Sequence, residues 1–183
     1  MRIIFVFSLP PRSFKEALRP RNSPTLNTKK LEMEERILQH IVEQKQRLAK
    51  ARINEDTEEE ADAYYSLGEA YYSLLDFHRA KEYLKQYLSI AEKVGNRAGA
   101  GGGYNKLGRA YGILGDHQRA MEYHSQDLRI TKEVVNREWE GCAYGNLGLA
   151  YQSLKEFQRA IEYHNQHLSI AKEAGNRECQ GKA

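Results

Sequence analysis

Residues 104–137 read YNKLGRAYGILGDHQRAMEYHSQDLRITKEVVNR, and this stretch decides the fold because close copies lie on both sides of it. The copies are YYSLGEAYYSLLDFHRAKEYLKQYLSIAEKVGNR at 64–97 and YGNLGLAYQSLKEFQRAIEYHNQHLSIAKEAGNR at 144–177, so the period is 40 residues. The positions that match in all three copies are Leu67, Leu107 and Leu147; Gly68, Gly108 and Gly148; Tyr71, Tyr111 and Tyr151; Ala80, Ala120 and Ala160; and Tyr83, Tyr123 and Tyr163. A fixed period of this kind is typical of arrays in which each unit packs on its neighbours.

Each unit is predicted to be a pair of antiparallel helices, called helix A and helix B. In the first unit, helix A is expected at about 60–74 and helix B at about 77–94, with a short turn at Leu75 and Asp76. The apolar face of this helix A follows three- and four-residue steps through Ala63, Tyr64, Leu67, Gly68, Ala70, Tyr71 and Leu74. Because Gly68 and Ala80 have little side-chain bulk, the two helices can approach closely. The sequence therefore predicts an all-α solenoid.

The ends of the helices carry their own signals. Thr57 and Glu60 form a predicted capping box ahead of the first helix A. The Asn-Arg pair after each helix B is predicted to form the turn, with Gly95 and Gly175 in the left-handed cap position. Val135 replaces this glycine in the second unit, where we expect strain.

The chain divides by composition. All four prolines lie in the first 24 residues, and residues 1–30 carry a net charge of +6, which leaves −3 for residues 31–183 out of the total of +3. We expect residues 1–29 to form an irregular basic leader. An amphipathic helix is predicted at 30–55 and the repeat array at 57–183, with units at about 60–99, 100–139 and 140–179. A truncated fourth unit begins at 180, which predicts that a longer parent protein continues.

Several functions are disfavoured by composition. The repeats lack a basic face for phosphates, so we expect no nucleic-acid partner. No apolar stretch approaches the roughly 20 residues that span a bilayer. Two isolated cysteines favour a reducing, cytoplasmic setting.

We also expect no metal, no cofactor and no catalytic site. His164 and His167 lie three residues apart, and His124 is at the position equivalent to His164. Other units have packing or surface residues at these positions, so we expect the same of the histidines. The glycines at 99, 101, 102 and 103 lack the strand and the Gly-Lys-Ser/Thr of a phosphate loop, and predict a weak, flexible helix start. The carboxylates recur once per unit, as surface residues do, and no separate cluster of nucleophile and base stands out.

The pattern Tyr-x2-Leu-Gly-x2-Tyr, with Ala80 nine residues after Tyr71, resembles the tetratricopeptide repeat signature. The 40-residue length and phrases such as AYGNLGLAYQSL are similar to a longer-repeat subgroup that includes G-protein-signalling modulators (the Partner of Inscuteable family) and tetratricopeptide repeat protein 28. This resemblance implies a right-handed superhelix with a concave, peptide-binding groove lined by the A helices. In that subgroup the asparagines of an NLGN phrase contact the ligand, and here only Asn146 matches the first of them, while Glu69, Arg109 and Leu149 replace the second.

The helical wheel predicts which residues face this groove, because they lie opposite the buried stripe. The predicted partner-binding residues are Asp62, Tyr65, Glu69 and Tyr72 in the first unit, Asn105, Lys106 and Arg109 in the second, and Asn146, Leu149 and Gln152 in the third. Their charge changes from acidic to basic to neutral along the array, which could orient a peptide ligand. The sequence thus predicts a protein-binding scaffold, with roles in G-protein signalling or spindle orientation implied by the resemblance.

Two alternatives stay open. The chain could be a homotypic assembly segment that associates with another copy through its unfinished C-terminal repeat. It could also be the repeat part of a larger protein with a C-terminal protease-like domain, as in the protein 28 group.

Overall fold

The computed structural model describes the backbone of residues 26–180 and the side chains of residues 28–175. Contacts divide the chain into two units, residues 1–35 and 36–183. In the described part of the first unit, Lys30 and Glu34 form an ion pair one turn apart on the same helix. The predicted leader lies largely outside the described residues.

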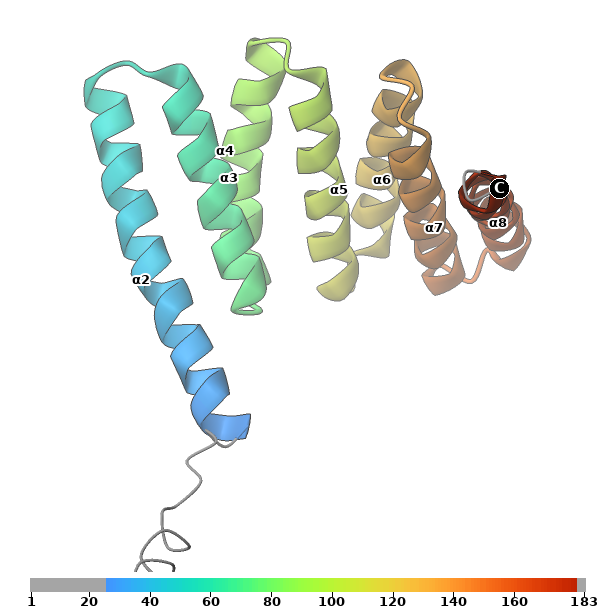
Figure 1. Ribbon diagram of the computed structural model, residues 1–183, viewed down its shortest axis with the longest axis horizontal. Coiled ribbons are helices and arrows are strands. Elements are labelled where there is room, and N and C mark those ends of the chain that lie inside the picture. The colour runs from blue at the N-terminus through green and yellow to red at the C-terminus, as the bar shows by residue number, and fades with distance from the viewer. Residues whose placement is uncertain (1–25, 181–183) are drawn as a thin grey trace, which may run out of the picture. The chain divides into compact units, whose positions relative to one another are not determined.

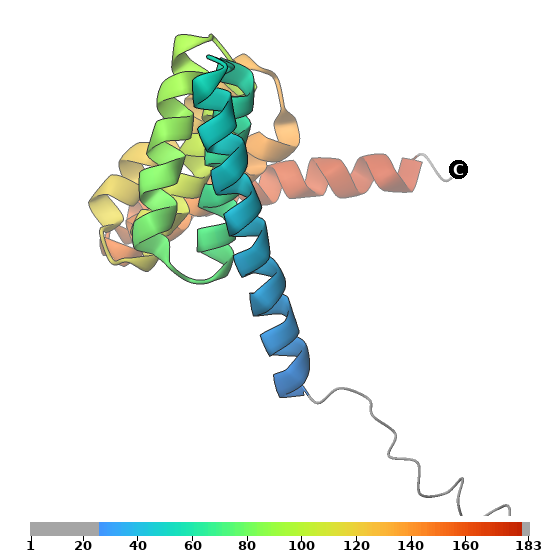
Figure 2. The same ribbon diagram turned by 90° about the vertical axis from the view of Figure 1, so that its left-hand side faces the viewer.

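The described residues form seven α-helices and contain no strand (Figure 1). The helices are α2 (Leu26–Ile53), α3 (Thr57–Ser73), α4 (Phe77–Lys93), α5 (Arg97–Ile113), α6 (His117–Glu133), α7 (Arg137–Ser153) and α8 (Phe157–Gln180). The A helices α3, α5 and α7 each pack on the B helix that follows, and α4 and α6 also pack on the next A helix. Within residues 36–183, the direction of the helix axes changes from one pair to the next, so that the axis of α8 is steeply inclined to that of α4 (Figure 2). The all-α solenoid of antiparallel pairs is confirmed.

A 20-residue spacing governs the helix links. Positive φ angles occur at Glu55, Leu75, Gly95, Gly115, Val135 and Lys155, and each of the first five immediately precedes the N-cap residue of the next helix. These cap residues are Asp56, Asp76, Asn96, Asp116 and Asn136, whose side-chain oxygens accept from a backbone N–H three residues on. The backbone N–H of the same residue donates back to the preceding helix, as in the 2.8 Å bond from Asn96 to the carbonyl of Ala91. One residue therefore ends one helix and starts the next.

Three predictions about the links are wrong in detail. The first helix A begins at Thr57 with Asp56 as its cap, because the Asp56 carboxylate reaches the Glu59 N–H at 3.0 Å, and no capping box forms with Thr57. Asn96 caps the following helix and is not only a turn residue. Gly175 lies inside α8 and does not have a positive φ. The positive φ of Gly95 and the strained Val135, at φ 53°, are confirmed.

Glycines set the distance between paired helices. A Cβ atom on Gly68 would lie 2.7 Å from Leu84 Cγ, and one on Gly108 would lie 2.5 Å from His124 Cε1. Real Cβ atoms do not come so close, so the predicted close approach of helices A and B is confirmed. Gly101 and Gly103 are buried in the regular helix α5, where a Cβ on Gly101 would meet Ile130 at 3.0 Å. Two glycines of the predicted weak helix start are therefore tightly packed, whereas a Cβ on Gly102 would meet no neighbouring atom within 4 Å.

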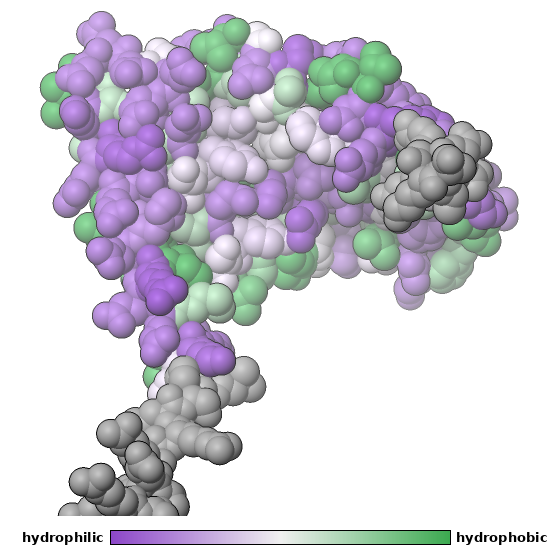
Figure 3. All heavy atoms as spheres, in the orientation of Figure 1, coloured by the Kyte–Doolittle hydropathy of each residue, from purple (hydrophilic) through white to green (hydrophobic). Residues whose placement is uncertain are grey.

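The hydrophobic core runs along the stack of helices. Buried side chains from α2 to α6 form one apolar cluster, and a smaller cluster of Leu147, Tyr151 and Ala160 joins α7 to α8. An exposed ion pair also links α2 to α3, since Arg47 meets Glu59 at 2.8 Å. Over residues 36–183, hydrophobic residues on the face in Figure 3 gather in small separate groups on a largely hydrophilic surface. No helix among the described residues is long and apolar enough to cross a membrane.

Candidate ligand-binding cleft

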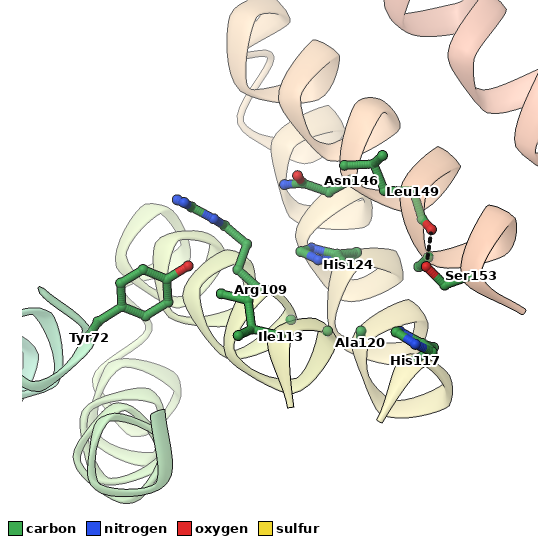
Figure 4. A pocket seen from close by; sticks show the side chains of 12 residues that line it. Tyr72, Arg109, Ile113, His117, Ala120, His124, Asn146, Leu149 and Ser153 are labelled. Atoms are coloured by element: carbon green, nitrogen blue, oxygen red, sulfur yellow. Dashed lines mark hydrogen bonds between the residues drawn. The ribbon is translucent and has the colours of Figure 1, made fainter. Parts of the chain in front are cut away.

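A cleft of about 300 Å³ opens between α5, α6 and α7, with one side chain from α3 at its edge (Figure 4). Its lining residues are Tyr72, Gly108, Arg109, Gly112, Ile113, His117, Ala120, His124, Asn146, Leu149, Ala150 and Ser153. Ile113 of α5 and Leu149 of α7 lie on opposite sides of the opening with His124 of α6 between them, and the Arg109 side chain extends towards Tyr72 (Figure 4). Three consecutive helices therefore build one concave site.

The walls of the cleft are mainly apolar. Ile113 is 55% exposed and Leu149 is 58% exposed, although both are large aliphatic residues. Ala120 and Ala150 are buried beneath them, and the glycines at 108 and 112 remove side-chain bulk. The hydroxyl of Ser153 donates to the Leu149 carbonyl at 2.9 Å, which leaves the aliphatic side chains as the main contact surface. Such a site suits an apolar side chain of a ligand.

Arg109 supplies the positive charge at the rim. Its guanidinium carbon lies 5.3 Å from the centre of the Tyr72 ring, a cation–π distance. Within the described part of the chain no carboxylate forms an ion pair with it. Lys106, one turn earlier, is instead paired with Glu69 of α3 at 2.7 Å. Arg109 is therefore the cation that remains available to a ligand, and the acidic-to-basic series of the sequence is partly neutralised within the protein.

Four of the ten predicted groove residues come together in the cleft. They are Tyr72, Arg109, Asn146 and Leu149. The other six lie elsewhere. Three of them are held by side chains of the same protein in pairs: Glu69 with Lys106, and Asn105 with Asp127 of α6. Tyr65 packs on Tyr87 with ring centres 4.9 Å apart, Asp62 lines a separate hollow, and Gln152 is exposed outside the cleft. The wheel placed four of its ten residues around one cleft, but it could not show which of the others have partners inside the protein.

His124 lines the cleft but was not among the residues predicted to face the groove. It is 4% exposed, it lies at the base of the cleft, and its Nδ1 has no hydrogen-bond partner among the described residues. Burial lowers its pKa to about 4, and the positive charge of Arg109 acts in the same direction. The ring is therefore neutral at pH 7. The signal in the sequence was Gly108, because the missing side chain there makes room for the imidazole.

The described side chains contain no cluster of three or more His, Cys, Asp or Glu residues that could hold a metal ion. His124 packs against Gly108, as Leu84 packs against Gly68 in the first repeat. His167 approaches Gly145, and a Cβ there would lie 3.1 Å from its Nδ1. These histidines fill space between helices of the stack.

A stack of antiparallel helix pairs with a cleft across three successive helices defines a helical-repeat scaffold, a class that presents extended concave binding surfaces. Two models of the tetratricopeptide repeat match residues 61–94 and 102–173, which together make up more than half of the chain. The chain belongs to the tetratricopeptide repeat family. Members of this family are in general interaction scaffolds without catalytic activity, and they bind protein partners.

Solved structures agree on the fold. The tetratricopeptide repeat domain of Arabidopsis FLU is 19% identical, with a TM-score of 0.61, and the match covers 64% of this chain and 98% of that one. The apo form of RapI is 19% identical with a TM-score of 0.71, and this chain spans only 40% of it. A putative kinesin light chain from Podospora anserina with nearly identical repeats is 21% identical, with a TM-score of 0.64 over 76% of this chain and 69% of that one. No curated protein matches the chain in sequence.

Proposed function

We propose that this protein is a scaffold that binds a peptide segment of a partner protein in the cleft between α5, α6 and α7. The observation that carries the proposal is the combination of exposed Ile113 and Leu149 with the unpaired Arg109 at the rim. An apolar ligand side chain would be buried between the two aliphatic residues. A neighbouring carboxylate would pair with Arg109, and Asn146 could bond to the ligand backbone.

The test is selection of peptides from a random display library by the full chain. We expect enriched peptides to carry Asp or Glu next to a large apolar residue. Arg109→Glu should weaken their binding by about tenfold or more, because it replaces attraction by repulsion. Arg129→Glu is the matched control, since Arg129 is an exposed α6 arginine that lies outside the cleft. Equal binding by wild type and Arg109→Glu, measured by isothermal titration calorimetry, would contradict the proposal.

The biological setting proposed here follows from the sequence resemblance. Similarity to the Partner of Inscuteable subgroup supports a role in G-protein signalling or spindle orientation, and similarity to the protein 28 group supports a parent with a protease-like domain. The exposed thiol of Cys142 suits a reducing, cytoplasmic environment. An interaction assay with the peptides selected above would identify the pathway through the proteins that contain them.

A second candidate function is assembly with another copy of the chain. One face of α8 supports it, because Phe157, Ile161 and Leu168 are 59%, 53% and 50% exposed. In the first repeat Leu88, at the position of Leu168, is only 8% exposed, since α5 covers it. Ile161→Glu with Leu168→Glu should then abolish any concentration-dependent increase in mass by analytical ultracentrifugation. A wild type that stays monomeric at high concentration would exclude this function.

A further inference from the structure

A stacked pair of tyrosines, one from helix A and one from helix B, recurs in each repeat outside the cleft. The two rings of each pair are nearly parallel, with interplanar angles of 5°, 11° and 7° in the three repeats. The pairs are Tyr71 with Tyr83 at 5.4 Å between ring centres, Tyr111 with Tyr123 at 5.2 Å, and Tyr151 with Tyr163 at 5.2 Å. The same aromatic surface is therefore built three times.

In the first two repeats, a lysine from the preceding helix lies over this surface. Lys81 Nζ lies nearest the Tyr111 ring, at 4.5 Å from its centre, and Ile41 and Met121 stand at this position in the other repeats. Lys45 Nζ is 5.8 Å from the centre of the Tyr71 ring, and Lys85 Nζ is 5.9 Å from the centre of the Tyr111 ring. The two lysines are 40 residues apart, so they occupy the same structural position. The Tyr111 hydroxyl accepts from the Lys85 ammonium, and this bond raises the lysine pKa. The aromatic pair thus holds a lysine both through its ring and through its hydroxyl.

The third repeat lacks this lysine. Ser125 stands at the position, and its hydroxyl donates to the Met121 carbonyl of its own helix at 2.8 Å. Among the side chains that the structure describes, the only cation over the Tyr151 ring is Arg159 at 5.5 Å. Its equivalents in the other two repeats make the same contact in addition to the lysine. The lysine that the first two repeats share is therefore missing here, as is a counterpart of Lys81.

The stacked tyrosines of the third repeat line a hollow of about 660 Å³ between α6, α7 and α8, which shares no residue with the cleft. Its lining residues are Leu128, Lys132, Tyr144, Tyr151, Arg159, Glu162, Tyr163 and Gln166. The equivalent hollow of the second repeat measures about 570 Å³, and Lys85 itself is part of its lining. Lys132 does not fill the vacant position, because it lies over Tyr144 at 5.2 Å.

We propose that this hollow of the third repeat binds a lysine side chain of a partner protein, whose ammonium takes the place that Lys85 takes in the second repeat. The Tyr151 and Tyr163 rings would bind the cation, and the exposed Glu162 carboxylate, which has no ion pair among the described residues, would neutralise it. Arg159 does not prevent this, since the second repeat accommodates Lys85 beside Arg119. The site lies on a different surface from the cleft and does not depend on the proposed peptide ligand.

The experiment is an NMR titration of the full chain, with its tyrosine rings isotope-labelled, using N-acetyl-lysine amide as the probe. We expect saturable shifts of the Tyr151 and Tyr163 ring signals and no saturable shift at Tyr111, where Lys85 already occupies the site. N-acetyl-norleucine amide, which has the same aliphatic stem without the ammonium, should give no saturable shift. Equal shifts with both probes, or none with the lysine probe, would overturn the proposal.

Variants of the lysine position test whether an internal lysine prevents the probe from binding in a given repeat. Ser125→Lys supplies an internal lysine and should remove the Tyr151 shifts, whereas Ser125→Met, of similar length without charge, serves as its control for steric blocking. Lys81→Met with Lys85→Ser, which copies Met121 and Ser125 of the third repeat, should create the second-repeat site, so that Tyr111 signals gain a saturable shift. If Ser125→Lys binds the probe as wild type does, or if the Lys81→Met, Lys85→Ser double variant gains nothing, the assignment is wrong. Far-UV circular dichroism checks that all three variants keep their helices.

Discussion

The first and second repeats share one backbone pattern but have different interiors. In the first repeat, Leu84 is fully buried against Gly68 and the Tyr87 ring packs on Tyr65. The corresponding positions of the second repeat are His124, 4% exposed, and Asp127, 3% exposed. Helix lengths and links are nevertheless the same in both. Glycine spacing and capping therefore determine the geometry of a repeat, and the apolar content of its interior determines its stability.

The interior of the second repeat contains two buried titratable groups, His124 and Asp127. Asp127 accepts one hydrogen bond, from the Asn105 amide at 2.8 Å, and burial raises its pKa to about 6 although that bond acts in the opposite direction. His124 is buried without a partner for Nδ1. Each such group lowers the free energy of unfolding. The cleft residue His124 thus lies in the repeat that we expect to open first.

The largest expected effect comes from Gly108→Leu, which tests whether a glycine is required opposite a histidine as it is opposite a leucine. The new side chain would overlap the His124 ring, so we expect a loss of about 3 kcal/mol or more in urea unfolding. Gly112→Ala is the control, because a Cβ there meets only Ala120 at an ordinary 3.7 Å. If both variants unfold at the wild-type urea concentration, the packing account of the repeat fails.

Asp127→Asn should stabilise the second repeat by removing a buried charge that the first repeat does not have at this position. At pH 7.5 we expect a gain of about 1–3 kcal/mol, since the variant no longer buries a charge while its amide oxygen can still accept from Asn105. Chemical denaturation at a series of pH values measures this. A variant that is less stable than wild type at pH 7.5 would show that the carboxylate is stabilised by its surroundings.

The pH dependence distinguishes the two buried groups. The pKa of His124 is lowered from 6.5 to about 4, so its neutral form is favoured in the folded state and stability is lost as the pH falls from 6.5 towards 4. The pKa of Asp127 is raised from 3.8 to about 6, so stability is gained as the pH falls from 6 towards 3.8. The two effects oppose each other in wild type. Asp127→Asn should therefore lose stability on acidification, and His124→Leu, which copies Leu84, should gain it.

The smallest expected effect concerns the link between the second and third repeats. Val135 has a φ of 53° and is 85% exposed, whereas the equivalent residue between the first and second repeats is Gly95. Val135→Gly should raise the free energy of unfolding by about 1 kcal/mol, because a β-branched residue is strained in the left-handed region and little packing is lost. Lys155→Gly, at φ 61° in another link, should give a smaller gain. Calorimetric melting temperatures would rank the two.

The sequence predicted the repeated helix pairs because the 40-residue period places the same small and aromatic residues at every contact. It placed the first cap at Thr57 because the Ser/Thr-x-x-Glu pattern was read without the positive φ of Glu55, which puts Asp56 at the cap. The candidate site was harder to predict. Asn105 and Lys106 lie on the expected face, but contacts with Asp127 and Glu69 from other helices engage them. Such pairings depend on the stacking of helices, which one helical wheel does not represent.

The double role of the cap residues has a consequence for how this chain can change in length. Each of Asp56, Asp76, Asn96, Asp116 and Asn136 accepts for one helix and donates to the other, with a positive φ just before it. A residue inserted into such a link would separate these two roles, and two helix ends would lose a cap together. A helix of 17 residues has no spare turn to absorb the shift. Insertions and deletions within the array are therefore expected to be tolerated as whole 40-residue units and selected against as single residues.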